Sequence, residues 1–248
     1  MSVLVEICAC SVDDVVAAET GGAQRVELCS ALALGGLTPS IGTLLECKRI
    51  STLPVMFMVR PRSGGFNYSQ ADFDAMERDV DMASESGADG FVFGFLNADG
   101  TIDRVRTKRL VDRVRGLPTV FHRAFDVTPD PIEALETIID LGMTRILTSG
   151  QKPTSIEGSK LIREMIERAS DRIEILPGGG IRPNNVAEIV QKTGCRMVHL
   201  SATTTKIDSS MKVNPSLRFN IANAPPEDSF GAVDPSIVAA IVSEARTQ

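Results

Sequence analysis

Short apolar segments recur along the whole chain, and each is followed by a longer amphipathic stretch with the spacing of a helix. The segments are rich in β-branched residues, which is typical of buried strands. They are Val3–Cys8, Arg25–Cys29, Val55–Arg60, Gly90–Phe93, Thr119–His122, Arg145–Thr148, Ile173–Pro177 and Met197–Ser201. Eight strands that alternate with helices indicate a parallel sheet, and eight such units favour its closure into a (β/α)₈ barrel, the TIM-barrel fold.

The stretches between the segments begin and end with residues that helices prefer. Ser69 with Asp72 forms a capping-box pattern, and a proline follows Asp130 where a first helical turn accepts it. An open doubly wound sheet is the alternative fold, but it ordinarily carries a glycine-rich loop after its first strand. Residues 8–11 read Cys-Ala-Cys-Ser and form no such loop, so the pattern favours the barrel.

The segment from Ser201 to Asp234 interrupts this rhythm because it is long and polar. A connection of this length inside a domain is usually functional or mobile. We expect a long loop over the mouth of the barrel here, before a last helix from Pro235 to about Arg246. No linker or low-complexity tract divides the chain, so residues 1–248 are predicted to form a single domain.

A glutamate followed two residues later by a cysteine occurs near the end of both of the first two predicted strands, as Glu6-Ile7-Cys8 and Glu27-Leu28-Cys29. Alternate side chains of a strand point to opposite faces, so each glutamate shares the inward face with its cysteine. A charged side chain is costly to bury unless it is paired or meets a ligand. The repeat therefore marks a candidate site on the inner face of the sheet.

Composition narrows the class of protein further. The formal net charge of −6 argues against a nucleic-acid-binding protein, which usually presents a basic face. No apolar run is long enough to span a bilayer, and no signal segment precedes the first strand. Five cysteines without a dense framework are compatible with a reducing cytosol.

Polar residues gather at the C-terminal ends of the predicted strands, where barrel enzymes place their active sites. If the chain is an enzyme, the candidate catalytic residues are Glu27, Arg60, His122 and Asp126. Glycine loops that lead into helices suit anions, so the candidates for holding an anion or a phosphate are Arg62, Ser149, Gly178, Gly179, Gly180 and Ser201. A network of structural ion pairs is the alternative interpretation of these charges, and His199 is a weaker candidate than His122.

The inward thiols of Cys8 and Cys29 allow two interpretations. Two thiolates suit a soft ion such as Cu(I), whereas zinc usually takes further ligands at a recognisable spacing, which the sequence lacks. Buried unpaired cysteine is also common as a small apolar side chain, and spacing alone leaves both interpretations open. No role is assigned to the other cysteines, which are Cys10, Cys47 and Cys195.

In combination and in order, several motifs resemble the CutC family of copper homeostasis proteins over nearly the full length. The motifs are the two Glu-x-Cys repeats, Gly35-Gly36-Leu37-Thr38-Pro39-Ser40, Arg60-Pro61-Arg62, Phe121-His122-Arg123-Ala124-Phe125-Asp126 and Leu147-Thr148-Ser149-Gly150. The chain departs from the family pattern at Gly65, where the family carries an acidic residue.

The resemblance implies a barrel fold and assembly as a homo-oligomer, either a dimer or a tetramer. It also implies a cytoplasmic location and allows presence in the nucleus. It also implies copper handling, with Cu(I) on Cys8 and Cys29, and attaches no firm reaction to the family. Two hypotheses follow. The chain is a Cu(I)-binding protein of copper homeostasis, or it is an enzyme that acts on a small anionic or phosphorylated metabolite at the barrel mouth.

Overall fold

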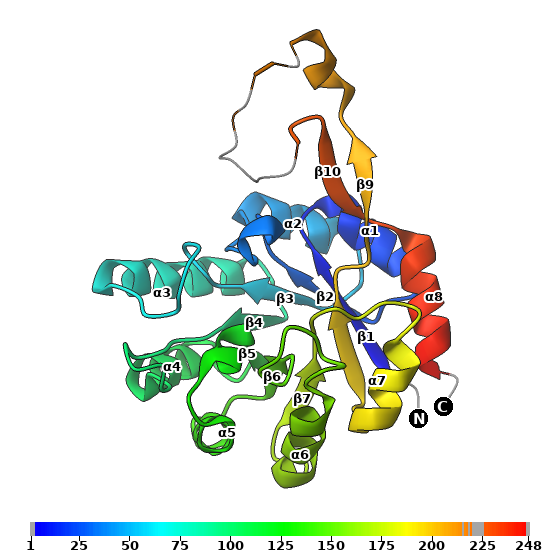
Figure 1. Cartoon of the computed structure of the whole chain (residues 1–248). Coiled ribbons are helices and arrows are strands. Elements are labelled where there is room, and N and C mark those ends of the chain that lie inside the picture. Colours follow the sequence, from blue (N-terminus) through cyan, green and yellow to red (C-terminus); the bar gives the residue numbers. More distant parts are fainter. Residues whose placement is uncertain (1–2, 215, 218, 220–225, 247–248) are drawn as a thin grey trace.

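Eight parallel strands form one sheet in the order β7-β6-β5-β4-β3-β2-β1-β8. The structure is a computed structural model, and it describes residues 3–214, 216–217, 219 and 226–246. A parallel bridge between Gly178 and His199 continues the order from β7 to β8. Figure 1 shows the strands around a common centre with the helices outside them, which confirms the predicted TIM barrel.

Each of the eight segments predicted from the sequence overlaps one strand of the barrel, and only β1 extends past its segment, by one residue. The strands are β1 (Leu4–Ala9), β2 (Arg25–Leu28), β3 (Val55–Met58), β4 (Gly90–Phe93), β5 (Thr119–Phe121), β6 (Arg145–Thr148), β7 (Glu174–Pro177) and β8 (Met197–Leu200). The helices are α1 (Val12–Thr20), α2 (Ile41–Ile50), α3 (Gln70–Glu85), α4 (Arg104–Arg113), α5 (Pro131–Asp140), α6 (Ser159–Ala169), α7 (Val186–Thr193) and α8 (Pro235–Arg246). Short 3₁₀ helices are η1 (Leu32–Leu34), η2 (Arg123–Val127) and η3 (Ser209–Val213). Arg60, His122 and Ser201 lie just beyond the strands, in the loops that form the mouth.

The alternation of side chains along the strands produces two apolar clusters. Val5 and Ile7 belong to the larger cluster, which the helices cover from outside. Cys8, Cys29 and Met58 belong to the smaller cluster, which fills the barrel interior. Facing layers of this kind keep water out of the barrel, so the polar residues of the inner face are buried as well.

The repeated Glu-x-Cys motifs do not lie side by side, because the barrel staggers its strands. In the β1–β2 register, Glu6 lies opposite Arg25 and Cys8 lies opposite Glu27. Cys29 follows the end of β2 and donates its backbone N–H to Ala9 at 2.9 Å. The stagger therefore gives the two glutamates different neighbours, although their local sequences are alike.

The predicted long connection after β8 is present, but its described residues beyond Ser201 contain an antiparallel ribbon and do not line the mouth cavity, so the expected placement over the mouth is wrong for them. Residues 215, 218 and 220–225 of this connection lie outside the described residues. Strand β9 (Thr203–Ile207) pairs with β10 (Ser229–Val233), and the ribbon projects outward from the barrel in Figure 1. All five residues of β9 are exposed. The base of the ribbon is fixed because Val233 donates its backbone N–H to Asp14 at 2.8 Å. Three consecutive β-branched threonines favour this strand, although they look polar in sequence.

Candidate functional site

A cavity of about 350 Å³ opens at the C-terminal mouth of the barrel. Side chains from the strand ends and from the following loops line it. The polar lining residues are Cys8, Glu27, Arg60, His122, Arg123, Arg182, His199 and Ser201, and the backbone of Gly179 and Gly180 completes one side. Most of these residues were expected from the sequence, but Arg123 and Arg182 were not proposed for this site, and His199 was given little weight.

Three thiols meet at the carboxyl end of β1 and β2. The Sγ atoms of Cys8 and Cys29 are 3.4 Å apart, and the Sγ atom of Cys10 lies 3.5 Å from that of Cys29. Cys8 and Cys29 are buried, whereas Cys10 is only partly buried. The sequence pattern predicted the inward direction of Cys8 and Cys29, but it assigned no role to Cys10.

A chain of buried charged groups runs beside the thiols. Arg25 donates from Nε to one oxygen of Glu6, and His199 donates from Nδ1 to the other oxygen at 2.8 Å. The second ring nitrogen of His199 lies 3.9 Å from an oxygen of Glu27. Ligand atoms of Cys8, Glu27 and His199 all lie within 4.8 Å of one another, so this group has the dimensions of a metal site.

The two glutamates have opposite electrostatic environments. Burial alone would raise the pKa of Glu6, but the hydrogen bond from His199 and the charge of Arg25 outweigh it and lower the pKa to about 2. Burial raises the pKa of Glu27 to about 7, against the opposing charge of His199. Glu6 is therefore a permanent anion, whereas Glu27 is able to exchange a proton near neutral pH.

The thiols also differ from one another. The Cys10 sulfur lies within hydrogen-bond distance of the Cys29 sulfur, and the neighbouring thiols of Cys29 and Cys8 lower the pKa of Cys10. The same contacts, together with burial, raise the pKa values of Cys8 and Cys29. One negative charge shared over three sulfurs is a donor set that suits a soft cation.

The opposite wall of the cavity is rich in hydrogen-bond donors. His122 accepts the backbone N–H of Ala124 at Nδ1, so its Nε2 carries the proton. Burial and the charge of Arg60 lower the pKa of His122 to about 3, which keeps the ring neutral. A Cβ on Gly94 would lie 2.7 Å from the His122 ring, so glycine is needed at the end of β4 to admit this side chain.

Three buried polar atoms of the cavity residues have no hydrogen-bond partner among the described residues. They are the Nε of Arg60, the Nε2 of His122 and the Oε2 of Glu27. A buried polar atom without a partner is costly in a folded protein, and such atoms commonly mark the place of a ligand or an ordered water. No ion pair joins Glu27, Arg60 and His122 in the part of the chain that the structure describes, so the mouth is not sealed by these charges.

Asp126 anchors the loop after β6 and does not line the cavity. Its carboxylate accepts hydrogen bonds from the Thr148 hydroxyl, from the Ser149 backbone N–H at 3.1 Å and from the Gln151 backbone N–H at 3.1 Å. It also forms an ion pair with Arg123 at 2.8 Å. These contacts hold the Arg123 side chain, which lines the cavity, whereas Asp126 itself does not line it.

Three of the predicted anion-binding residues lie outside the cavity. Arg62 forms an ion pair with Asp72 at 3.1 Å and stacks over Tyr68, on the outer side of its loop. Ser149 is held within the loop after β6, and Gly178 bonds to the backbone of β6. Strand alternation does not apply to Arg62, because Arg60 and Arg62 lie beyond the end of β3 and flank Pro61 in a turning loop, so the two side chains need not share a direction. At Gly65 no atom lies within 4 Å of the Cβ position, so there is space for the acidic side chain that the family carries here, but glycine supplies no carboxylate.

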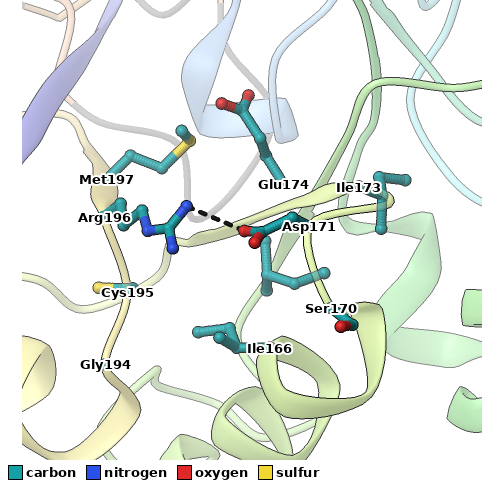
Figure 2. Close-up of a pocket in the computed structure, with 10 residues that line it drawn as sticks. Ile166, Ser170, Asp171, Ile173, Glu174, Gly194, Cys195, Arg196 and Met197 are labelled. Carbon is teal, nitrogen blue, oxygen red and sulfur yellow. Dashed lines mark hydrogen bonds and ion pairs between the residues drawn. The ribbon is translucent and has the colours of Figure 1, made fainter.

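A second cavity, of about 450 Å³, lies between the starts of β7 and β8 (Figure 2). Arg196 points toward Asp171 across it, and the two form an exposed ion pair at 2.9 Å. Glu174 and Met197 begin the two strands that diverge here. The cavity marks the gap where β7 and β8 pair only by the bridge near their other ends, and it lies away from the end of the barrel where such folds place their active sites.

Comparison with known proteins identifies the family. A family model described as the CutC family matches residues 3–204, which include every residue of the mouth cavity. The chain belongs to the CutC family. A CutC family protein from Treponema denticola is 50% identical over 229 residues, which cover 92% of this chain and 93% of the relative.

Two further relatives of this CutC-family chain carry copper homeostasis in their descriptions. The copper homeostasis protein cutC homolog of Homo sapiens is 47% identical over 209 residues, 84% of this chain and 76% of the human protein. A crystal structure of the CutC protein from Streptococcus agalactiae has a TM-score of 0.77 at 37% identity, and the match covers 80% of this chain and 98% of that one. Within the described residues of the CutC-family chain, no helix combines the length and the apolar character that crossing a bilayer requires.

Proposed function

We propose that the chain is a copper homeostasis protein that binds Cu(I) through Cys8 and Cys29. The observation that carries the proposal is the 3.4 Å separation of their Sγ atoms, since two inward thiols at different heights of the barrel could not share an ion. An ion held about 2.3 Å from each sulfur needs the sulfurs roughly 4 Å apart in a bent arrangement and about 4.6 Å apart in a linear one, so the two side chains need to separate by about 1 Å at most.

The surroundings of the thiols support a soft ion. Cys8 and Cys29 lie in the interior cluster with Met56 and Met58, so soft sulfur atoms and apolar side chains surround them on the inner side of the barrel. Thiolates select Cu(I) over the harder divalent ions. Cu(I) also tolerates low coordination numbers, whereas a site that used Cys8, Glu27 and His199 would suit zinc better. The copper descriptions of the human and streptococcal relatives support the same assignment.

Cu(I) affinity, measured anaerobically against a competing chelator, tests this proposal. Cys8→Ser and Cys29→Ser are expected to weaken binding, and Cys47→Ser is the matched control because Cys47 is fully buried in α2, outside the interior cluster. Unchanged affinity in both test variants would remove these thiols as the site. A larger loss in Glu27→Gln or His199→Ala, with zinc bound more tightly than copper, would move the metal to the Cys8, Glu27 and His199 group instead.

A second function is supported by the same mouth, namely the binding and conversion of a small anionic metabolite. The specific observation is that Arg60, His122 and Glu27 each carry an unpartnered buried polar atom and line a cavity that Arg123 and Arg182 also line. Two donors and one acceptor, next to cationic side chains, complement an anionic group that carries a hydroxyl or another protonated atom. Glu27, whose pKa is raised to about 7, has the proton affinity of a general acid or base.

Calorimetric titration with inorganic phosphate and with glycerol 3-phosphate tests the anion site. Arg182→Gln is expected to weaken binding because Arg182 lines the cavity and forms no ion pair among the described residues. Arg62→Gln is the matched control, since Arg62 lies in the loop after β3 but outside the cavity. Equal affinities in the wild type and in both variants would show that the cavity is not an anion site.

A further inference from the structure

Cys10 follows Cys8 by two residues and lies one residue beyond the end of β1. Alternation along an ideal strand would send both side chains to the same face, but the chain turns after Ala9 toward helix α1. The Cys10 sulfur nevertheless comes to 3.5 Å from the Cys29 sulfur, which in turn lies 3.4 Å from the Cys8 sulfur. Cys29 therefore contacts both thiols of the Cys-Ala-Cys segment.

We propose that Cys10 is a third ligand of the bound Cu(I) and completes a three-sulfur site with Cys8 and Cys29. This inference rests on the proposed copper function. It adds to that proposal a coordination number of three and a third ligand that is partly exposed. Cys8 and Cys29 are buried, whereas Cys10 is partly exposed, so its sulfur lies on the more accessible side of the three thiols.

Cys10 is held in place and is not a loosely attached surface cysteine. Its backbone N–H donates to Asp14 at 2.9 Å, and the other oxygen of the same carboxylate accepts the backbone N–H of Val233 at 2.8 Å. The neighbouring Ser11 caps α1 by accepting the backbone N–H of Asp14 at 3.1 Å. A buried carboxylate thus joins the start of α1, the base of the ribbon and the Cys10 backbone, which fixes the direction of the thiol.

The surroundings of the Cys10 sulfur favour a thiolate. Cys10 directly precedes Ser11, the N-cap residue of α1, and the unpaired backbone N–H groups at a helix N-terminus stabilise negative charge nearby. This positive potential favours a third thiolate, since three thiolates around Cu(I) carry two net negative charges.

Binding at this site involves only proton release and bond formation to sulfur. Copper remains Cu(I), each thiol that becomes a ligand loses one proton to the solvent, and no oxidant or reductant takes part. A trigonal ion about 2.3 Å from each sulfur needs sulfurs roughly 4 Å apart. The contacts of 3.4 and 3.5 Å are close to this geometry, so the three side chains need to separate only slightly.

X-ray absorption at the copper edge tests the proposal on the anaerobic, full-length protein loaded with one equivalent of Cu(I). We expect three sulfur ligands in the wild type and two in Cys10→Ser, with a loss of Cu(I) affinity of at least the 10–100-fold seen for outer-shell changes. Cys47→Ser is the control and should keep three sulfurs. Two sulfurs in both the wild type and Cys10→Ser would overturn the role of Cys10 while leaving the Cys8 and Cys29 site intact.

Protection from alkylation supplies a second measurement that needs no variant. In the metal-free protein, iodoacetamide should label Cys10 before Cys8 and Cys29, because Cys10 is the most exposed of the three thiols. One equivalent of Cu(I) should protect Cys10 at least as strongly as the two buried thiols. Labelling of Cys10 that copper does not slow would contradict the inference, whereas failure of the wild type to bind Cu(I) at all would instead contradict the proposed function.

Discussion

Replacing each glutamate of the repeated motif by glutamine is predicted to have opposite effects on stability. Glu6 is stabilised as an anion by Arg25 and His199, and its pKa is lowered to about 2, from an ordinary value of 4.5. Glu27 is destabilised as an anion by burial, and its pKa is raised to about 7. Both carboxyl groups are buried, so solvent does not screen these effects.

The magnitudes follow from linkage between protonation and folding. A pKa displaced by about 2.5 units corresponds to roughly 3 kcal/mol. For Glu6, whose folded pKa lies below the unfolded value, this stability is present above pH 4.5 and is lost as the pH falls toward 2. For Glu27, whose folded pKa lies above the unfolded value, the destabilisation is absent below pH 4.5, grows as the pH rises and is complete above about pH 7.

We therefore expect Glu27→Gln to raise the free energy of unfolding at pH 8 by up to about 3 kcal/mol, with the difference vanishing near pH 4.5. Glu6→Gln should lower it by about 3–5 kcal/mol at pH 8, because it leaves the buried Arg25 without its partner. Urea unfolding of the reduced, metal-free protein between pH 4.5 and pH 8 measures both. Equal destabilisation by the two substitutions at pH 8 would refute the assignment of opposite environments.

Three further predictions concern the mouth. Asp126→Asn should lower the free energy of unfolding by about 2–3 kcal/mol in a urea titration, because the loop after β6 loses the carboxylate that accepts hydrogen bonds from Thr148 and Ser149. Gly94→Ala should cost about 1–3 kcal/mol in the same assay and shift the imidazole NMR signals of His122, because the added methyl overlaps the ring. Unshifted signals would contradict this packing. Cu(I) affinity should fall as the pH is lowered from 8 to 6, because protons compete for Cys8 and Cys29, whose pKa values are raised, and a chelator competition series with no pH dependence would argue against thiolate ligands.

The family sequence motifs and the geometry of the mouth support two chemistries that share one residue, Cys8. Cys8 is one of the three neighbouring thiols, and it also lines the mouth cavity together with His122 and Arg60. A ligand in the cavity and an ion at the thiols would therefore be neighbours. Measuring phosphate affinity with and without Cu(I) shows whether the two sites influence each other.

The sequence by itself determined the barrel and the direction of its side chains. A period of two along each strand and the capping signals before several of the helices are local properties, so the eight strands and the inward face of Glu6, Cys8 and Glu27 followed from them. The same local rules identified His122 and Arg60 at the mouth, because position after a strand end is also readable from the sequence.

Only the tertiary structure decided which of these residues meet. The stagger between β1 and β2 places Glu6 against Arg25 and leaves Glu27 with the more distant charge of His199, and no local pattern encodes that register. The turn after Ala9 brings Cys10 to Cys29, whereas a proline between Arg60 and Arg62 sends Arg62 out of the cavity. Distances between strands depend on shear and loop geometry, which arise from the packing of the whole barrel.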